Sequence, residues 1–113
     1  MINTQDERDE LAQLNLLAGQ RAKATAAYHA ACDYLQVGLQ LLSSAGESHW
    51  DRLYDLTLAL HVEAAETSYL SGSFAEMERL AGIIQQQART RLDKIKIIEV
   101  QIQAYTTQNK LQK

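Results

Sequence analysis

The stretch Ala18-Gly19-Gln20-Arg21-Ala22 has a counterpart 46 residues later, Ala64-Ala65-Glu66-Thr67-Ser68. In both stretches small residues cluster, and small side chains let two helices approach closely. Each stretch leads to a break and then to an aromatic residue, Tyr28 in the first copy and Phe74 in the second. The breaks are Ala24-Thr25-Ala26 and Ser71-Gly72-Ser73. The first contains no Gly or Pro, so local rules allow one continuous helix there, and this break rests on comparison with the second copy. Small cluster, turn, aromatic residue and second apolar helix predict a helix-turn-helix unit that occurs twice.

The composition favours long helices and few connections. The 113 residues include no proline and five glycines, whereas strand-rich folds need both for tight turns. A chain of this length fits a single domain, and 46% hydrophobic and 22% charged residues are typical of a soluble globular protein. We therefore expect one all-α domain over residues 1–113, built of stacked antiparallel helical hairpins.

Redox and targeting signals point to a cytoplasmic protein. Cys32 is the single cysteine, so no intramolecular disulfide is possible. No apolar run approaches the roughly 18 residues of a membrane span, and the polar N-terminus does not resemble a signal peptide. We expect no membrane partner.

Charge is unevenly distributed along the chain. Residues 1–88 hold 5 basic and 12 acidic side chains, whereas residues 89–113 hold 6 basic and 2 acidic ones. A basic tail can attract nucleic acid, but cations also stabilise helix ends. Arg89, Arg91, Lys94 and Lys96 surround an expected helix junction, so we interpret them as helix-end residues and expect no nucleic-acid partner.

Periodicity predicts five helices, each with one apolar face. Their expected ranges are about 7–23, 26–43, 48–70, 73–89 and 91–108. The residues expected on these faces are, in chain order, Leu11, Leu14, Leu17 and Ala18; Tyr28, Ala31, Leu35, Leu39 and Leu42; Trp50, Leu53, Tyr54, Leu56, Leu60, Ala64 and Tyr69; Phe74, Met77, Leu80, Ala81, Ile84 and Ala88; and Leu92, Ile95, Ile98, Ile102 and Tyr105.

Capping residues support these boundaries. Thr4 or Asp6 is the expected N-cap of the first helix, and Ser48 with Asp51 and Ser73 with Glu76 have the spacing of capping boxes. The stretch 43–48 is the clearest turn of the chain. Residues 108–111 resemble the second break, so we expect a further helix beyond them, and the chain to be part of a longer array with an apolar face at its end.

Two groups of side chains have the composition of a chemical site. His29, Cys32 and Asp33 lie near one another on one helix, but zinc needs three or four ligands, and His49 and Asp51 lie on a different segment. A small core cysteine is the simpler interpretation. We expect no metal and no cofactor.

The second group, His61 with Glu63 and Glu66, suggests acid–base chemistry. The helical spacing keeps the three apart, so we expect a surface histidine with satisfied hydrogen bonds. No phosphate loop, nucleophile elbow or His-Glu-x-x-His motif occurs. We therefore expect no catalytic residue and no enzyme activity.

Other polar and aromatic residues have binding interpretations. The glutamines Gln36, Gln40, Gln85, Gln86, Gln87, Gln101 and Gln103 are either a hydrogen-bonding surface or solvent-facing helix formers, and we favour the second. Trp50 and Tyr54 are either anchors for a partner or a cover over the preceding helix pair, which we favour.

The chain resembles a known module through three stretches, residues 14–22, 54–66 and 74–80, with Tyr54-Asp55-Leu56-Thr57-Leu58 the most specific. It is similar to the tetratricopeptide-like helical region of large bacterial, especially cyanobacterial, signalling proteins. Those proteins join a serine/threonine kinase, an AAA-type ATPase, this helical region, a GAF domain and often a sensor histidine kinase. The resemblance spans roughly residues 11–110 and implies a right-handed array of about five helices.

The chain departs from the general tetratricopeptide pattern in two ways: its period is 46 residues rather than 34, and it lacks the closing proline. No kinase or ATPase motif falls within it, so no catalytic residue carries over. The resemblance implies a non-catalytic module that holds protein partners or neighbouring domains, with possible self-association through its exposed end. The alternative is a helical bundle that senses a small ligand in a pocket lined by Tyr28, Tyr34, Tyr54 or Tyr69.

Overall fold

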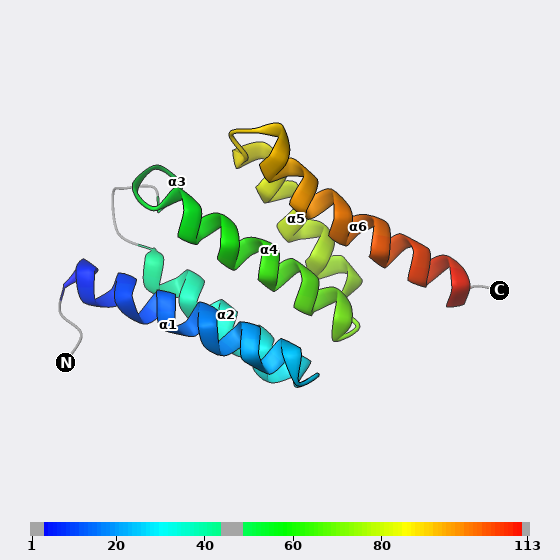
Figure 1. Ribbon diagram of the computed structural model, residues 1–113, viewed down its shortest axis with the longest axis horizontal. Coiled ribbons are helices and arrows are strands. Elements are labelled where there is room, and N and C mark those ends of the chain that lie inside the picture. Colours follow the sequence, from blue (N-terminus) through cyan, green and yellow to red (C-terminus); the bar gives the residue numbers. More distant parts are fainter. Residues whose placement is uncertain (1–3, 44–48, 112–113) are drawn as a thin grey trace.

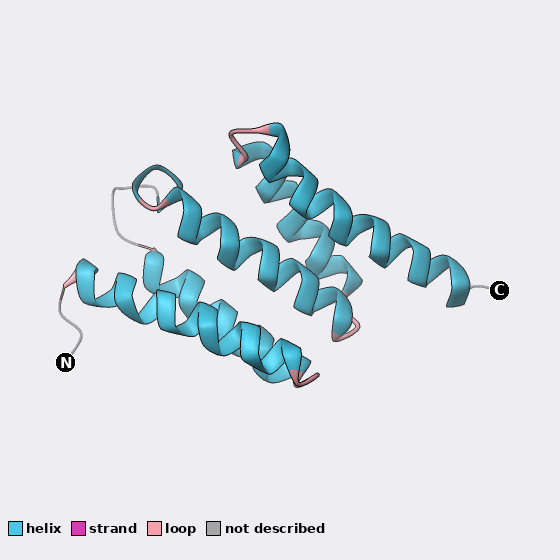
Figure 2. Ribbon diagram, in the orientation of Figure 1, coloured by secondary structure: helices cyan, strands magenta, loops and turns pink. Residues whose placement is uncertain are grey.

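The computed structural model describes residues 4–43 and 49–111, which form six α-helices and no strand (Figures 1 and 2). The helices are α1 (Gln5–Ala24), α2 (Tyr28–Leu42), α3 (His49–Arg52), α4 (Tyr54–Leu70), α5 (Phe74–Gln87) and α6 (Arg91–Leu111). The predicted all-α class is confirmed.

The helices are arranged in layers. α1 and α2 form one antiparallel hairpin and α4 and α5 form another, with α6 packed on the far side of the second (Figure 1). α4 lies at the centre and contacts α1, α2, α5 and α6. The three helices α1, α4 and α6 run in the same direction (Figure 1). The Cα radius of gyration is 14.3 Å, above the roughly 13 Å of a compact domain of this length, so the molecule is elongated.

The turns of the two hairpins correspond at an offset of 46 residues. Ala26 has φ 64° and Gly72 has φ 96°, the two left-handed residues among those described. The N–H of Ala27 donates to the carbonyl of Ala22 at 2.8 Å, and that of Ser73 donates to Ser68 at 2.7 Å. The predicted break after Ala24 is therefore confirmed, although no Gly or Pro marks it.

Two glycines set how closely the helices pack. A Cβ on Gly19 of α1 would lie 2.6 Å from Leu35 Cγ on α2. A Cβ on Gly38 of α2 would lie 2.9 Å from Leu60 Cδ2 on α4. Both distances are shorter than a Cβ contact in proteins, so a side chain at either position would force the facing leucine to move. The small residue at position 19 was predicted to have this role, whereas Gly38 was not identified.

The third expected helix is divided, and the prediction of five helices is wrong in this respect. Leu53 (φ −137°, ψ 66°) leaves the helical conformation between α3 and α4. The break lets the buried Trp50 ring stack on His61 of α4, with 4.7 Å between centroids. It also brings Arg52 to Asp9 of α1. Tertiary contacts therefore override a local sequence that is compatible with one helix.

The predicted core faces are confirmed for α2 and α5. Ala31, Leu35 and Leu42 of α2 are buried. So are four predicted residues of α5: Met77, Leu80, Ala81 and Ile84. α4 is buried on more sides than one face allows, because α1, α2, α5 and α6 surround it.

The predicted faces of α1 and α6 are wrong. In α1 the buried residues are Ala12, Leu16 and Gly19, whereas Leu14 and Leu17 are exposed. In α6 the buried residues are Ile97, Val100 and Ala104, whereas the predicted Leu92, Ile95, Ile98 and Ile102 are exposed. Tyr105 is partly exposed, but its ring contacts Phe74 and its hydroxyl donates to Glu78 of α5. Each of these end helices has two apolar faces, and the one with smaller residues packs closest to its neighbours.

Of the predicted N-caps, the one of α1 is confirmed and the one of α5 is wrong. Thr4 caps α1, accepting from the Glu7 N–H at 3.2 Å. Ser73 occupies the N-cap position of α5, but its side chain makes no capping hydrogen bond, so the predicted box with Glu76 is wrong. Thr90, which the prediction missed, accepts from the Asp93 N–H at 3.1 Å at the start of α6. The predicted Ser48 cap lies outside the described residues.

Candidate interaction surfaces

The predicted His29, Cys32 and Asp33 group is not assembled as a metal site. His29 and Asp33 are exposed, and the half-buried Cys32 Sγ lies 3.8 Å from the Ser71 hydroxyl of α4's C-cap. Within residues 4–43 and 49–111, no three His, Cys, Asp or Glu side chains come together in a metal-binding arrangement. The side chain of His49 lies outside the described residues. Cys32 contributes to the contact between the two hairpins.

His61 is buried, so the expectation of a surface histidine is wrong in its location. Its Nδ1 lies 2.8 Å from the Thr57 carbonyl, and its ring packs on Trp50. As predicted, Glu63 and Glu66 do not join it. Both carboxylates instead lie 2.7 Å from Lys23 Nζ of α1.

Ion pairs therefore link the two hairpins. Burial lowers the pKa of Lys23, but the hydrogen bonds that its ammonium donates to Glu63 and Glu66 outweigh burial and leave the pKa above its ordinary 10.5. At the other end of α1, burial raises the pKa of Asp9, and hydrogen bonds from Arg52 and Gln5 outweigh it, so the pKa lies below 3.8. These charged side chains are held in place by partners within the chain.

Trp50 and Tyr54 contact α4 and the α5–α6 turn, which was not predicted from the sequence. The Tyr54 hydroxyl donates to Asp93 Oδ2 at 2.6 Å and accepts from the Arg89 N–H at 2.8 Å. The Arg89 guanidinium lies 4.2 Å from the Tyr54 ring centroid and donates to the Trp50 carbonyl. These contacts fix the α5–α6 turn against the start of α4.

The glutamines are solvent-facing helix residues, as favoured, with one exception. Gln101 is half-buried between α5 and α6, where it accepts from Gln85 at 2.9 Å and approaches Glu78. Gln36, Gln40, Gln86, Gln87 and Gln103 are exposed.

The four tyrosines of the ligand-sensing alternative do not meet. Tyr34 is exposed on α2, Tyr54 lies at the α5–α6 turn, and Tyr69 pairs with Thr107 of α6 at 3.0 Å. Tyr28 opens α2. The rings therefore occupy separate places. Tyr34 lines a groove on α1 and α2, and Tyr69 lines a different hollow with Phe74 and Thr107.

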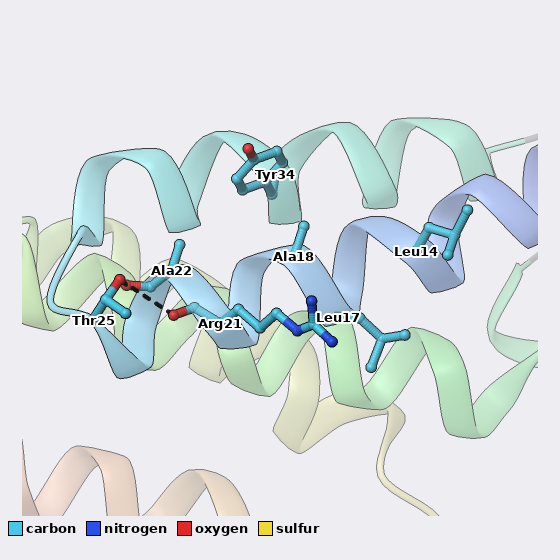
Figure 3. Close-up of a pocket in the computed structure, with 7 residues that line it drawn as sticks. All are labelled: Leu14, Leu17, Ala18, Arg21, Ala22, Thr25 and Tyr34. Atoms are coloured by element: carbon cyan, nitrogen blue, oxygen red, sulfur yellow. Dashed lines mark hydrogen bonds between the residues drawn. The ribbon is translucent and has the colours of Figure 1, made fainter.

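An apolar groove lies on the outer side of α1 and α2 (Figure 3). Its volume is about 510 Å³. It is lined by Leu14, Leu17, Ala18, Arg21, Ala22 and Thr25 of α1 and by Tyr34 of α2. Leu14 is 58% exposed, Leu17 47% and Tyr34 45%. We call these seven residues the α1/α2 groove.

A second apolar surface lies at the other end of the molecule. The outer face of α6 carries Leu92, Ile95, Ile98 and Ile102, all exposed, with Leu92 at 74%. We call these four residues the α6 stripe. Sequence reasoning selected the α6 stripe as core, because it repeats at helical spacing as a core face does. Only the packing of the helices shows which apolar faces are exposed at the two ends of the molecule and which are buried at its centre.

No described helix is long and apolar enough to cross a membrane. No family model matches the chain, and no solved structure matches it with significance. The chain is similar to a segment of Hybrid signal transduction histidine kinase G of Dictyostelium discoideum, with 30% identity over 95 residues. The match covers 79% of this chain and 3% of the kinase.

Proposed function

We propose that the chain is a non-catalytic, tetratricopeptide-like helical-repeat module of a signal-transduction protein, mediating contacts between proteins or neighbouring domains. The observation that carries the proposal is that both ends of the layered helices present apolar helix surfaces, the α1/α2 groove and the α6 stripe. Free apolar patches of this kind mark interaction sites.

The correspondence of the two hairpin turns supports the repeat interpretation. In such arrays each unit buries its apolar faces against its neighbours, and stacking produces a rigid surface. Binding at that surface biases the domains on either side, which is how a module without catalytic groups influences a kinase. The similarity to a short segment of a histidine kinase is consistent with this role.

The proposal includes a longer parent protein of cytoplasmic location. It is tested by sequencing the gene on both sides and by sizing the native protein on an immunoblot. We expect a polypeptide much larger than 12.7 kDa that encodes a kinase or nucleotide-binding domain. Deleting residues 4–111 from it is expected to change the regulation of autophosphorylation. A native protein of the size of this chain contradicts the proposal, as does ATP hydrolysis or phosphotransfer by the isolated chain.

A further inference from the structure

The α1/α2 groove has a counterpart in the second hairpin that is already covered. The residues 46 positions after its lining are Leu60, Glu63, Ala64, Thr67, Ser68, Ser71 and Leu80. Leu60 is 0% exposed where Leu14 is 58% exposed, and Leu80 is 3% exposed where Tyr34 is 45% exposed. The difference arises because α2 lies on the second hairpin, with Gly38 against Leu60. The groove is therefore a helix-binding surface whose equivalent inside the molecule holds a helix.

The α6 stripe has the pattern of apolar and charged residues that this groove requires. Along α1 the groove presents Leu14, Leu17 and Arg21, at spacings of three and four residues. Along α6 the exposed face presents Leu92, Ile95 and Glu99 at the same spacings. If α6 of one copy lies parallel to α1 of another in this register, Leu92 lies beside Leu14 and Ile95 beside Leu17. The Glu99 carboxylate then lies beside the Arg21 guanidinium.

Charge complementarity favours this register. Arg21 and Glu99 are both exposed, and neither forms an ion pair with any residue that the structure describes. The first hairpin (residues 5–42) carries 5 acidic and 3 basic side chains, a net charge of −2, and α6 (residues 91–111) carries 4 basic and 2 acidic ones, a net charge of +2. The two ends of the molecule therefore attract each other between copies.

The parallel direction follows from the row of α1, α4 and α6 and not from α2, which runs antiparallel to α4 over the equivalent groove (Figure 1). α1, α4 and α6 run in the same direction, and α4 contacts both α1 and α6 (Figure 1). A second copy stacked on the same axis would continue this row, with its α1 beside α6 of the first. We propose that the α6 stripe of one copy docks in the α1/α2 groove of another, joined by a Glu99–Arg21 ion pair. The inference rests on the proposed function, because it assumes that the chain works by binding protein surfaces.

Such a contact joins two different surfaces, so a dimer leaves one groove and one stripe free to bind further copies. The test uses Leu17→Glu, which blocks the groove, and Ile95→Glu, which blocks the stripe. The second hairpin carries Glu63 at the position equivalent to Leu17, so a glutamate fits the helix there. Circular dichroism verifies that both variants remain helical.

Sedimentation velocity then measures association. We expect the mass of the wild type to rise with concentration, each variant alone to stay monomeric, and their equimolar mixture to form a dimer and nothing larger. The mixture pairs the one intact groove with the one intact stripe. A wild type that stays monomeric, or a mixture that gives no dimer, overturns the docking proposal. Neither result bears on the parent protein, which the gene sequence and immunoblot test separately.

The register is tested by exchanging charges. Arg21→Glu and Glu99→Arg each place like charges together and are expected to weaken association by about tenfold. The double variant restores the pair with its sign reversed and is expected to recover most of the affinity. Lys96→Glu, one turn from the pair's register, is the matched control with a smaller effect. Association that persists in both single variants, or that the double variant fails to recover, contradicts this register.

Discussion

Single residues at the hairpin turns set the backbone of this fold. Ala26 and Gly72 occupy equivalent left-handed positions, yet one is alanine and the other glycine. An L-residue with a Cβ pays a steric cost in this region that glycine does not. The two turns therefore have similar geometry, but the backbone is strained at Ala26 and unstrained at Gly72.

We predict that Ala26→Gly raises the free energy of unfolding by about 0.5–1 kcal/mol, because relief of the left-handed strain exceeds the added entropy of the unfolded chain. Gly72→Ala is expected to lower it by about 1 kcal/mol. No atom lies within 4 Å of a Cβ at position 72, so any change there reports the backbone alone. Urea denaturation measures both. A loss of stability in Ala26→Gly contradicts the prediction.

A second residue-scale prediction concerns close packing. Gly19→Ala drives its new Cβ against the fully buried Leu35, and overpacking costs about 1–3 kcal/mol. Gly82→Ala on α5 meets nothing within 4 Å and gains helix propensity of up to about 1 kcal/mol. Chemical denaturation is therefore expected to rank Gly19→Ala below Gly82→Ala by at least the overpacking cost. Equal stabilities of the two variants contradict the close α1–α2 approach.

At the scale of the element, α6 shows that an apolar face does not reveal which side is buried. Ile97 is 0% exposed and Ile98 is 41% exposed, although the two are adjacent in sequence. The buried side is the one with Val100 and Ala104, whose smaller side chains fit against α4 and α5.

Ile97→Ala is expected to lower the free energy of unfolding by about 2–4 kcal/mol, since it removes buried methyl groups and leaves a cavity. Ile98→Ala is expected to cost less than about 1 kcal/mol, because its side chain is already partly in water. Thermal and urea unfolding at low protein concentration compare the pair. The reverse order of stabilities is inconsistent with the observed face of α6.

At the scale of the whole molecule, two sets of ion pairs bridge the first hairpin to α3 and α4. Lys23 binds Glu63 and Glu66 near one end of α1, and Arg52 binds Asp9 near the other. Arg52 Nη2 also donates to the carbonyl of Leu42 at the end of α2, at 3.3 Å. Ion pairs near both ends of α1 therefore hold the first hairpin against α3 and α4.

We predict that Asp9→Asn lowers the free energy of unfolding at pH 7 by about 1–2 kcal/mol. Because the folded pKa of Asp9 lies below its ordinary 3.8, its stabilising effect is present above that pH and is lost as the pH falls through the folded value. The stability difference between wild type and Asp9→Asn is thus expected to shrink below about pH 4. Denaturation series from pH 7 to 2.5 measure it. A difference that is independent of pH contradicts the pairing.

The sequence alone determined the local structure of this protein. The missing prolines, the helical periodicity and the 46-residue correspondence identified the all-α class and the break after Ala24. The all-α class depends on the conformational preferences of neighbouring residues, which a sequence displays directly. The break after Ala24 was found by comparing the two copies, because local preferences alone allow a continuous helix there.

Only the tertiary structure decided which apolar faces are buried. Leu14 and Leu60 are both leucines in equivalent helices, yet only Leu60 has a helix lying on it. The same holds for the break at Leu53, which stacking of Trp50 and pairing of Arg52 stabilise. Burial depends on what stands opposite a side chain, and in this chain that neighbour comes from another layer of helices.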